Sequence, residues 1–326
     1  MMGSVVATLG AAKPYRQKPV GSTDKAQFRL YPYGSVQFVD PRVTTPLTFA
    51  HVTDLHLTPS PVAESEKVYR GAIDWRDRTF NRPHQVLPKV LAEIRDANVD
   101  FVFFGGDNID CYHPATAERV IKLARDYGLN TYFQSGNHDW ETLHIRYVTH
   151  DYDATWRATA LQKLVRHWNM PAPYYSFEKK GVRFIALDPP YRRENGEWKG
   201  RFDIQQTEWF LNRLRYEGPL IIFHHIPFNR PTLEPRLRTV WNGAAPCVAE
   251  DRNGDRIMRA IEACPNILGT FTGHAHIRSE DALGQTCQFM TAPASDGQWR
   301  YVKVGNADPP KSLRASGLPD LPLRSH

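Results

Sequence analysis

The amino-acid sequence predicts an α/β fold organised around a parallel sheet. The stretch FVFFGGDN, Phe101 to Asn108, is a short apolar run closed by two glycines and an aspartate. Such a run is typical of a parallel strand that is covered on both faces, because that strand loses its polar alternation. Helical patterns lie on either side of it, over residues 86–97 and 115–127. The order strand, helix, strand, helix is typical of a parallel sheet.

The other elements are expected from shorter signals. The helix over 86–97 has apolar residues on one face, and the helix over 115–127 ends at Gly128, a common stop signal. Lys179 to Gly181 should form the turn of a hairpin between residues 174 and 188. We also expect edge strands within 28–40, a first core strand over 48–52, a helix around 155–168, a further helix within 200–214, and two paired strands over 288–292 and 299–304 that complete a second sheet.

Metal-binding side chains follow five of the apolar runs. A single aspartate after a strand is more often a turn or capping residue, so the argument depends on the whole set. In open α/β sheets, ligands bind at the carboxyl ends of the strands. The runs are LTFAHVTDLH with Asp54 and His56, FVFFGGD with Asp107, LNTYFQSGNHD with Asn137, His138 and Asp139, LIIFHHIP with His224 and His225, and ILGTFTGHAH with His274 and His276.

The residue types in this set indicate a transition-metal site. Residues two apart on an extended chain project to the same side, so Asp54 with His56, and His274 with His276, could each hold one ion. Asp, Asn and His suit Mn, Fe or Zn better than calcium, which prefers oxygen ligands alone. The absence of cysteine from the set argues against a closed structural zinc site.

The motif string resembles that of the calcineurin-like metallophosphoesterase family. TDLH, GGDNID, GNHD, FHH and GHAH occur in the order of the family's motifs, between about Thr48 and Val304. The resemblance implies a four-layer α/β sandwich of two mixed β-sheets flanked by helices. It also implies a dinuclear metal site, in which one ion is held by Asp54, His56, Asp107 and His276, and the other by Asp107, Asn137, His224 and His274, with Asp107 as the bridge.

The same resemblance implies the chemistry. Two metal ions would activate water and hold the phosphate, so no serine or cysteine nucleophile is needed. His138 would stabilise the phosphoryl oxygens or protonate the leaving group, and Asp139 would orient it. Purple acid phosphatases, which are relatives, have tyrosine three residues after the bridging aspartate, whereas this chain has Asp110. This difference favours the phosphodiesterase branch; a phosphomonoesterase is the alternative, and a scaffold without catalysis is disfavoured because every ligand position is kept.

Composition is compatible with this function. The chain has 326 residues, of which 41% are hydrophobic, and no stretch approaches the length of a membrane span. A formal net charge of +6 would attract an anionic phosphate ester, although a general solubility charge explains it equally well. No basic and aromatic repeat indicates a nucleic-acid surface. The four cysteines are far apart and neither require nor exclude disulfides.

The two ends of the chain are expected to lie outside the domain. Residues 1–27 begin with a small, apolar stretch that resembles the end of a twin-arginine export signal, which would make the mature protein periplasmic. The alternative is a frayed cytoplasmic N-terminus. We place the metallophosphoesterase domain at residues 28–305 and expect residues 306–326 to be disordered.

Two long loops should border the site. Residues 57–85 follow His56 without clear periodicity, and they contribute candidates for contacting substrate. Residues 227–256 follow the two histidines and could decide substrate choice. The candidates in the first loop are Tyr69, Arg70, Trp75, Arg76, Arg78, Arg82 and His84.

Overall fold

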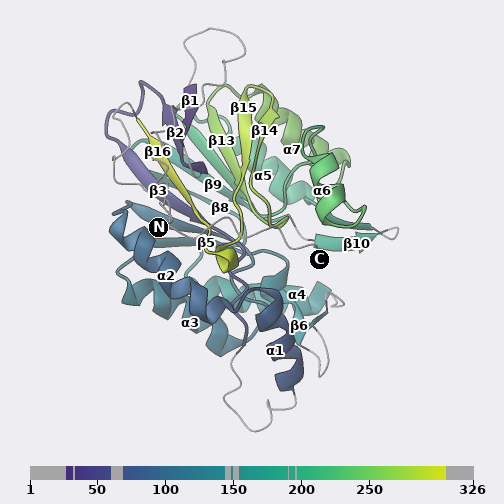
Figure 1. The fold of residues 1–326 in the computed structure, drawn as a ribbon. Helices are drawn as coiled ribbons and strands as arrows, with labels where there is room; N and C mark the ends of the chain where they lie inside the picture. Colours follow the sequence, from purple (N-terminus) through teal and green to yellow (C-terminus); the bar gives the residue numbers. More distant parts are fainter. Residues whose placement is uncertain are drawn as a thin grey trace, which may run out of the picture.

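The computed structural model consists of two six-stranded sheets that pack face to face (Figure 1). It describes residues 27–31, 34–59, 69–143, 148–149, 154–189, 191–194 and 197–305. The segments expected to lie outside the domain, 1–26 and 306–326, are not among the described residues. None of the described helices has the length and apolar character needed to cross a membrane.

The first sheet contains the strand that carries Asp107. Its three neighbouring strands β3, β4 and β5 are parallel, so their carboxyl ends lie at one edge. β16 is antiparallel to β3 and joins it to the β1–β2 hairpin. In spatial order the strands are β1 (Gln27–Leu30), β2 (Val36–Val39), β16 (Arg300–Val304), β3 (Leu47–Val52), β4 (Phe101–Gly105) and β5 (Thr131–Gln134).

The second sheet is also mixed, with parallel strands at its centre. β9, β12, β13 and β15 run parallel, and β8 and β14 are antiparallel edge strands. In spatial order the strands are β14 (Ser279–Leu283), β15 (Thr286–Met290), β13 (Ile267–Thr272), β12 (Leu220–His224), β9 (Val182–Leu187) and β8 (Tyr175–Lys179). Two short hairpins stand apart, β6 (Thr142–Leu143) with β7 (Val148–Thr149) and β10 (Tyr191–Glu194) with β11 (Glu197–Gly200).

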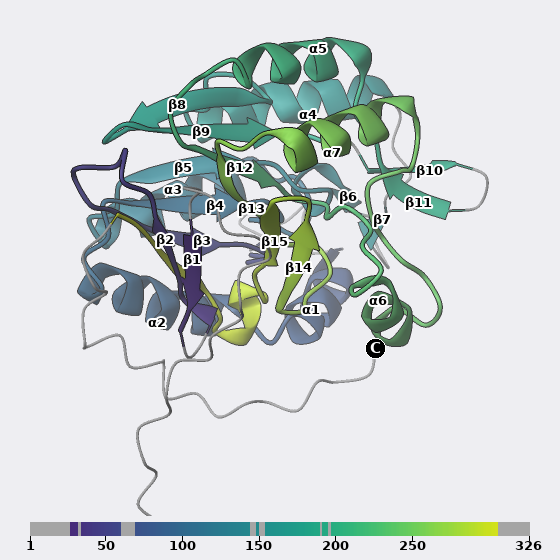
Figure 2. The same ribbon diagram turned by 90° about the horizontal axis from the view of Figure 1, so that it is seen from above.

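Helices cover the outer faces of both sheets and complete four layers (Figure 2). α2 (Pro83–Asp96) and α3 (Pro114–Asp126) bury one apolar face against the first sheet, and α5 (Ile204–Arg213) and α7 (Arg252–Ala263) do the same on the second. α4 (Ala154–His167) packs beside α3. α1 (Arg70–Thr79) and α6 (Glu234–Val240) lie toward the carboxyl ends of the strands.

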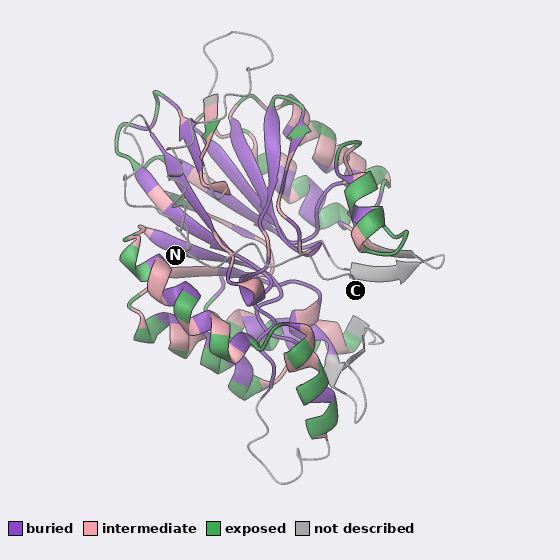
Figure 3. Ribbon diagram, in the orientation of Figure 1, coloured by how far each residue is buried: buried purple, intermediate pink, exposed green. Residues whose placement is uncertain are grey.

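Aromatic rings fill the space between the sheets. Phe49 of β3 contacts the rings of Phe184, Phe223 and Phe271 from the facing sheet, with centroids 5.5–5.7 Å apart. All four side chains are fully buried, and the purple interior of the burial view follows this layer (Figure 3). Because the two sheets are tied together here, their carboxyl ends are held close to each other.

Most of the expected elements are confirmed, and two expectations are wrong. The helices expected at 86–97, 115–127 and 155–168 appear as α2, α3 and α4, each shifted by three residues or fewer. The strands expected at 288–292 and 299–304 do not pair with each other, because β15 joins the second sheet and β16 the first. The loop expected over 57–85 contains helix α1, and its residues 60–68 lie outside the described part.

Candidate metal centre

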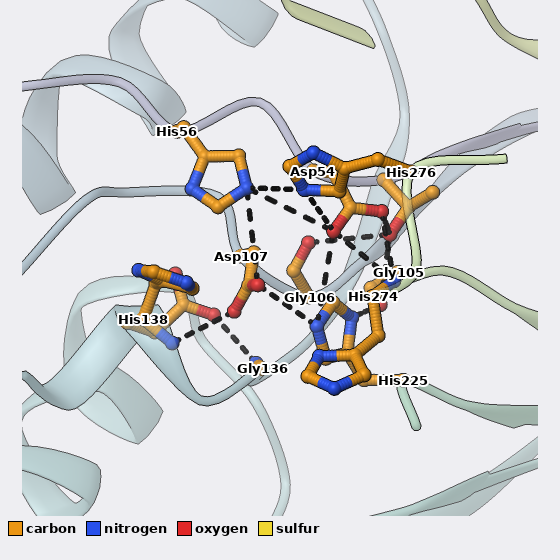
Figure 4. Close-up of polar contacts among 12 residues, drawn as sticks. Asp54, His56, Gly105, Gly106, Asp107, Gly136, His138, His225, His274 and His276 are labelled. Carbon is orange, nitrogen blue, oxygen red and sulfur yellow. Dashed lines mark hydrogen bonds and ion pairs between the residues drawn. The ribbon is translucent and has the colours of Figure 1, made fainter. Parts of the chain in front are cut away.

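Aspartates and histidines from both sheets, all of them buried except the half-buried His276, meet at the carboxyl ends of the strands (Figure 4). Asp54 and His56 follow β3, Asp107 follows β4, and His225 follows β12. His274 and His276 follow β13 and complete the group, which we call the metal cluster. Within the cluster, sets of three residues bring one potential ligand atom each to within 4.8 Å of the others.

One half of the cluster consists of Asp54, His56 and His276. The Nε2 atoms of the two histidines are 2.9 Å apart, and the Oδ1 atom of Asp54 lies 3.4 Å from His276 Nε2 and 3.9 Å from His56 Nε2. The backbone N–H of His274 donates to both carboxylate oxygens of Asp54, at 3.1 and 3.0 Å. The aspartate is therefore fixed by the second sheet although it belongs to the first.

The other half consists of Asp107, His225 and His274. Asp107 Oδ2 lies 3.0 Å from His225 Nε2 and 3.9 Å from His56 Nε2, so this carboxylate stands between the two halves. Its Oδ1 accepts the backbone N–H of His138 at 2.8 Å. His274 and His276 belong to different halves, which contradicts the simple expectation that each two-apart pair holds one ion. The division implied by the family resemblance separates them in the same way.

Left-handed backbone conformations distinguish the cluster from ordinary strand ends. Asp54, His56, Asp107, His274 and His276 have φ values of 55°, 48°, 51°, 70° and 56°. Non-glycine residues rarely adopt positive φ, and such strain collects at functional sites, where the surrounding structure over-determines it. The side chains converge through this local turn and not through the extended geometry that the sequence suggested.

Gly136 permits the close approach of the loops. A Cβ atom at this position would overlap the side chain of Asp107 and would lie 2.7 Å from His225 Nε2. Glycine is therefore required where the loop after β5 passes beneath the cluster. The next residue, Asn137, is 2% exposed, and its Oδ1 accepts no hydrogen bond from the part of the chain that the structure describes.

His225, and not His224, joins the cluster. Ile221 and Phe223 of β12 face the other sheet, whereas Leu220 and Ile222 face the helices. By alternation, His224 falls on the helix side, where Nδ1 lies 2.8 Å from the carbonyl oxygen of Ile226 and the ring packs 4.8 Å from Phe228. The structure thus does not bring His224 to the other predicted ligands, and we replace it with His225 in the proposed set.

His138 is held beside the cluster by a network of charged side chains. Its Nδ1 atom lies 2.8 Å from Glu141 Oε2 and 3.1 Å from Asp110 Oδ1. Asp110 Oδ1 is also 3.5 Å from Nδ1 of His56. Arg76 of α1 donates to both oxygens of Asp110, each at 2.7 Å. One buried carboxylate therefore positions a predicted ligand and the predicted catalytic histidine together.

Asp139 does not take part in this network, contrary to the role expected for it. Its carboxylate accepts the backbone N–H groups of Ile109 at 2.9 Å and Gly136 at 2.6 Å, and thereby ties two site loops together. Burial, assisted by the charge of Asp107, raises the pKa of Asp139 to about 8. Glu141 and Asp110 supply the contacts to His138 that the sequence interpretation assigned to Asp139.

The electrostatics favour anionic carboxylates at the centre. Burial alone would raise the pKa of Asp54, but the hydrogen bond with His276 and the charge of His225 lower it to about 2. Burial would likewise raise the pKa of Asp107, and the charges of His225 and His138 hold it well below its usual range. Both side chains are at most 1% exposed. Buried anions of this kind require positive charge close by.

The donor set fits two transition-metal ions. Two ionised aspartates, four histidines and the amide oxygen of Asn137 are the ligand types that suit such ions. The Oδ1 of Asn137 is buried without a hydrogen-bond donor, which a metal ion would satisfy. A further group, Asp110, His138 and Glu141, has ligand-type side chains as well. Arg76 already neutralises one carboxylate of that group, because its guanidinium donates to both oxygens of Asp110.

The fold and the cluster define a metal-dependent phosphoesterase. The profile of the calcineurin-like phosphoesterase family matches residues 47–278, which is well over half of the chain. The protein belongs to this family, whose members use a dinuclear metal centre. A comparison with curated protein sequences gives no significant match.

Two solved phosphatase structures are similar to this chain. A dimetal phosphatase from Danio rerio superposes with a TM-score of 0.50 at 16% identity, over 76% of this chain and 88% of the other. A purple acid phosphatase from yellow lupin (Lupinus luteus) seeds gives a TM-score of 0.46 at 11% identity, over 88% of this chain and 62% of the other. At 16% identity the likeness to the Danio rerio phosphatase concerns the fold alone, and the four-layer α/β sandwich expected from the sequence is confirmed.

Proposed function

We propose that this protein hydrolyses phosphodiesters with two transition-metal ions bound at the metal cluster. The observation that carries the proposal is the convergence of Asp54, His56, Asp107, His225, His274 and His276 around one carboxylate, Asp107. We assign Asp54, His56 and His276 to one ion and Asn137, His225 and His274 to the other, with Asp107 shared. Mn, Fe and Zn all suit this donor set.

The chemistry of such a centre needs no protein nucleophile. Bound metal ions of this kind polarise phosphoryl oxygens and lower the pKa of water. The protein contributes the arrangement of the ligands, and Asp110 and the backbone N–H groups hold those ligands in place before substrate arrives. Preorganisation of this type is a large part of catalysis, because no groups must reorient during the reaction.

His138 is the proposed general acid. Its side chain is 15% exposed, so it can reach a bound substrate, while Glu141 and Asp110 fix its Nδ1 side. Burial would lower the pKa of His138, but the charges of Glu141 and Asp107 and the hydrogen bond with Asp110 raise it well above its usual range. The imidazolium form can therefore give its Nε2 proton to a departing alkoxide.

The charges around the cluster favour a diester over a monoester. A phosphodiester carries one negative charge, whereas a monoester carries close to two at neutral pH. Arg76 is already paired with Asp110, and Arg157 is paired with Asp188 at 2.6 Å. Neither arginine is available to compensate the additional charge of a monoester without breaking a buried ion pair.

A substrate comparison tests the proposal. Metal-depleted protein should be inactive, and Mn²⁺, Fe²⁺ or Zn²⁺ should restore turnover. On the reloaded protein, kcat/KM for bis(p-nitrophenyl) phosphate should exceed that for p-nitrophenyl phosphate by about 10-fold or more. This ratio measures how much less the site stabilises the transition state of the monoester. A higher kcat/KM for the monoester would make the protein a phosphomonoesterase of the same fold.

A further inference from the structure

An exposed tryptophan lies beside the metal cluster. Trp241 follows α6, and its ring centroid lies 6.2 Å from that of His274 and 6.3 Å from that of His276. The planes of Trp241 and His274 are inclined by only 15°. The residue is nevertheless 37% exposed, although a large apolar side chain is usually buried more completely. The indole thus presents a surface to solvent directly beside two proposed metal ligands.

The orientation of this indole is fixed. Its Nε1–H donates to the carbonyl oxygen of Ala275, the residue between the two histidines, at 3.2 Å. Its backbone N–H bonds to Leu237, whose side chain is fully buried among Leu233, Cys247, Ala275, Ile277 and Met290. An exposed side chain held in one orientation on a buried anchor loses little entropy when a ligand binds it.

Phe80 provides a useful contrast on the other side of the same histidines. Its ring stacks on His56 with centroids 3.6 Å apart, and its edge meets His276 at 5.8 Å. Phe80 is 7% exposed, and the guanidinium of Arg76 lies over its ring. Both aromatic residues therefore flank His276, but Phe80 has its surface covered by protein while Trp241 leaves part of its surface open.

We propose that Trp241 is a specificity-determining residue that stacks on a planar aromatic group of the substrate. The proposal rests on the proposed function, because the phosphoester must be held at the metal cluster for the aromatic group to reach Trp241. The substrate class is then a phosphoester that carries a nucleobase. Every base has a π-face, so stacking on an aromatic side chain recognises the ring without requiring one particular base.

The test uses two diesters that share a leaving group. Thymidine 5′-(p-nitrophenyl phosphate) carries a base, and ethyl p-nitrophenyl phosphate does not. Trp241→Leu keeps an apolar side chain but removes the aromatic face, and Trp241→Phe keeps an aromatic face; both lose the hydrogen bond to Ala275. We expect Trp241→Leu to raise KM for the thymidine diester about 10-fold, with kcat and the ethyl diester little changed, and Trp241→Phe to restore most of the loss.

A matched control and a binding assay separate the possible outcomes. Trp209 of α5 contacts Tyr174 and Arg213 and shows no ring contact with a histidine of the cluster within the described chain, so Trp209→Leu should leave both substrates unaffected. Calorimetric titration of metal-loaded protein with adenosine 5′-phosphate should show the same weakening in Trp241→Leu, even if the wild type fails to hydrolyse diesters. Equal changes for the two diesters, or unchanged nucleotide binding in Trp241→Leu, would overturn the proposal.

Discussion

Different kinds of side chain border the two sides of the metal cluster. Beside His56 and His138, charged side chains are buried and paired, with Arg76 and Glu141 closing on Asp110 and His138. Beside His274 and His276 lies Trp241, whose side chain is partly exposed and donates a hydrogen bond to a backbone carbonyl. We call these the charged wall and the aromatic wall.

This difference suggests a division of labour. A buried network of charged groups fixes the orientation and the protonation state of its side chains. The low dielectric constant of the interior strengthens each contact and makes an unpaired charged group costly. An open aromatic face fixes little and can accept different ring-bearing groups. We therefore expect changes in the charged wall to reduce turnover on every substrate, and changes in the aromatic wall to alter only the choice among substrates.

Removing the residue shared by both halves should have the largest effect. Asp107→Asn weakens the ligand between the two ions, so we expect bound metal to fall and hydrolysis to be abolished together. Elemental analysis after dialysis and an activity assay measure both. Asp40→Asn is a matched control, because Asp40 is 1% exposed and ion-paired at the opposite edge of the first sheet, and it should retain full metal. Two tightly bound ions and normal turnover in Asp107→Asn would refute the shared-ligand assignment.

The two neighbouring histidines of FHH should differ sharply. His225→Ala should lose about one metal equivalent and nearly all activity, since its Nε2 faces Asp107. His224→Ala should keep both ions and lose about 1–3 kcal/mol of unfolding free energy, because a buried ring and its bond to Ile226 are removed. Metal analysis and urea unfolding provide the measurements. If the variants exchange these behaviours, His224 is the ligand.

His138→Ala tests the acid on the charged wall. Both ions should remain bound, while turnover of a diester with an alkoxide leaving group falls by about 10²–10⁴-fold. Release of p-nitrophenolate, which needs no protonation, should fall much less. Equal losses for both leaving groups would indicate that His138 stabilises the phosphoryl oxygens, and loss of metal would show that it is a ligand.

The arginine that closes the charged wall should have a smaller effect. Arg76→Met leaves Asp110 without its cation, and we expect activity or metal affinity to fall by about 10–100-fold, the range found for residues that hold metal ligands in place. Arg157→Met is a close control, since Arg157 has the same 13% side-chain exposure and is also ion-paired with a buried aspartate. Equal losses of activity in the two variants would reduce the role of Arg76 to general stability.

The sequence predicted the architecture because strong local patterns carried it. Apolar runs followed by polar residues marked the core strands β3, β4, β5, β12 and β13, and the periodicity of residues 86–97 marked α2. The placement of β16 was missed, because strand pairing between distant segments leaves no local signal. Helix α1 was missed because most of its residues are polar, and only Ala72 and Ile73 are buried.

The sequence predicted which segments supply the candidate site, but not all of the contacts between their side chains. Every run that ends in the cluster was found, yet β12 is apolar on both faces, so its sequence alone does not reveal which of His224 and His225 faces inward. Counting alternate positions from Phe223 would have favoured His225, once the face of Phe223 is known. The role of Glu141 was also missed: it lies three residues after His138, across one turn of a short 3-10 helix, and only the folded loop brings it close.

Anomalous diffraction from crystals loaded with Mn²⁺ would test the central claim most directly. We predict two strong peaks about 3.5–4 Å apart, one on each side of the Asp107 carboxylate. One peak should contact Asp54, His56 and His276, and the other should contact Asn137, His225 and His274. A single peak, or peaks that contact His224 and leave His225 without a bound ion, would contradict the account.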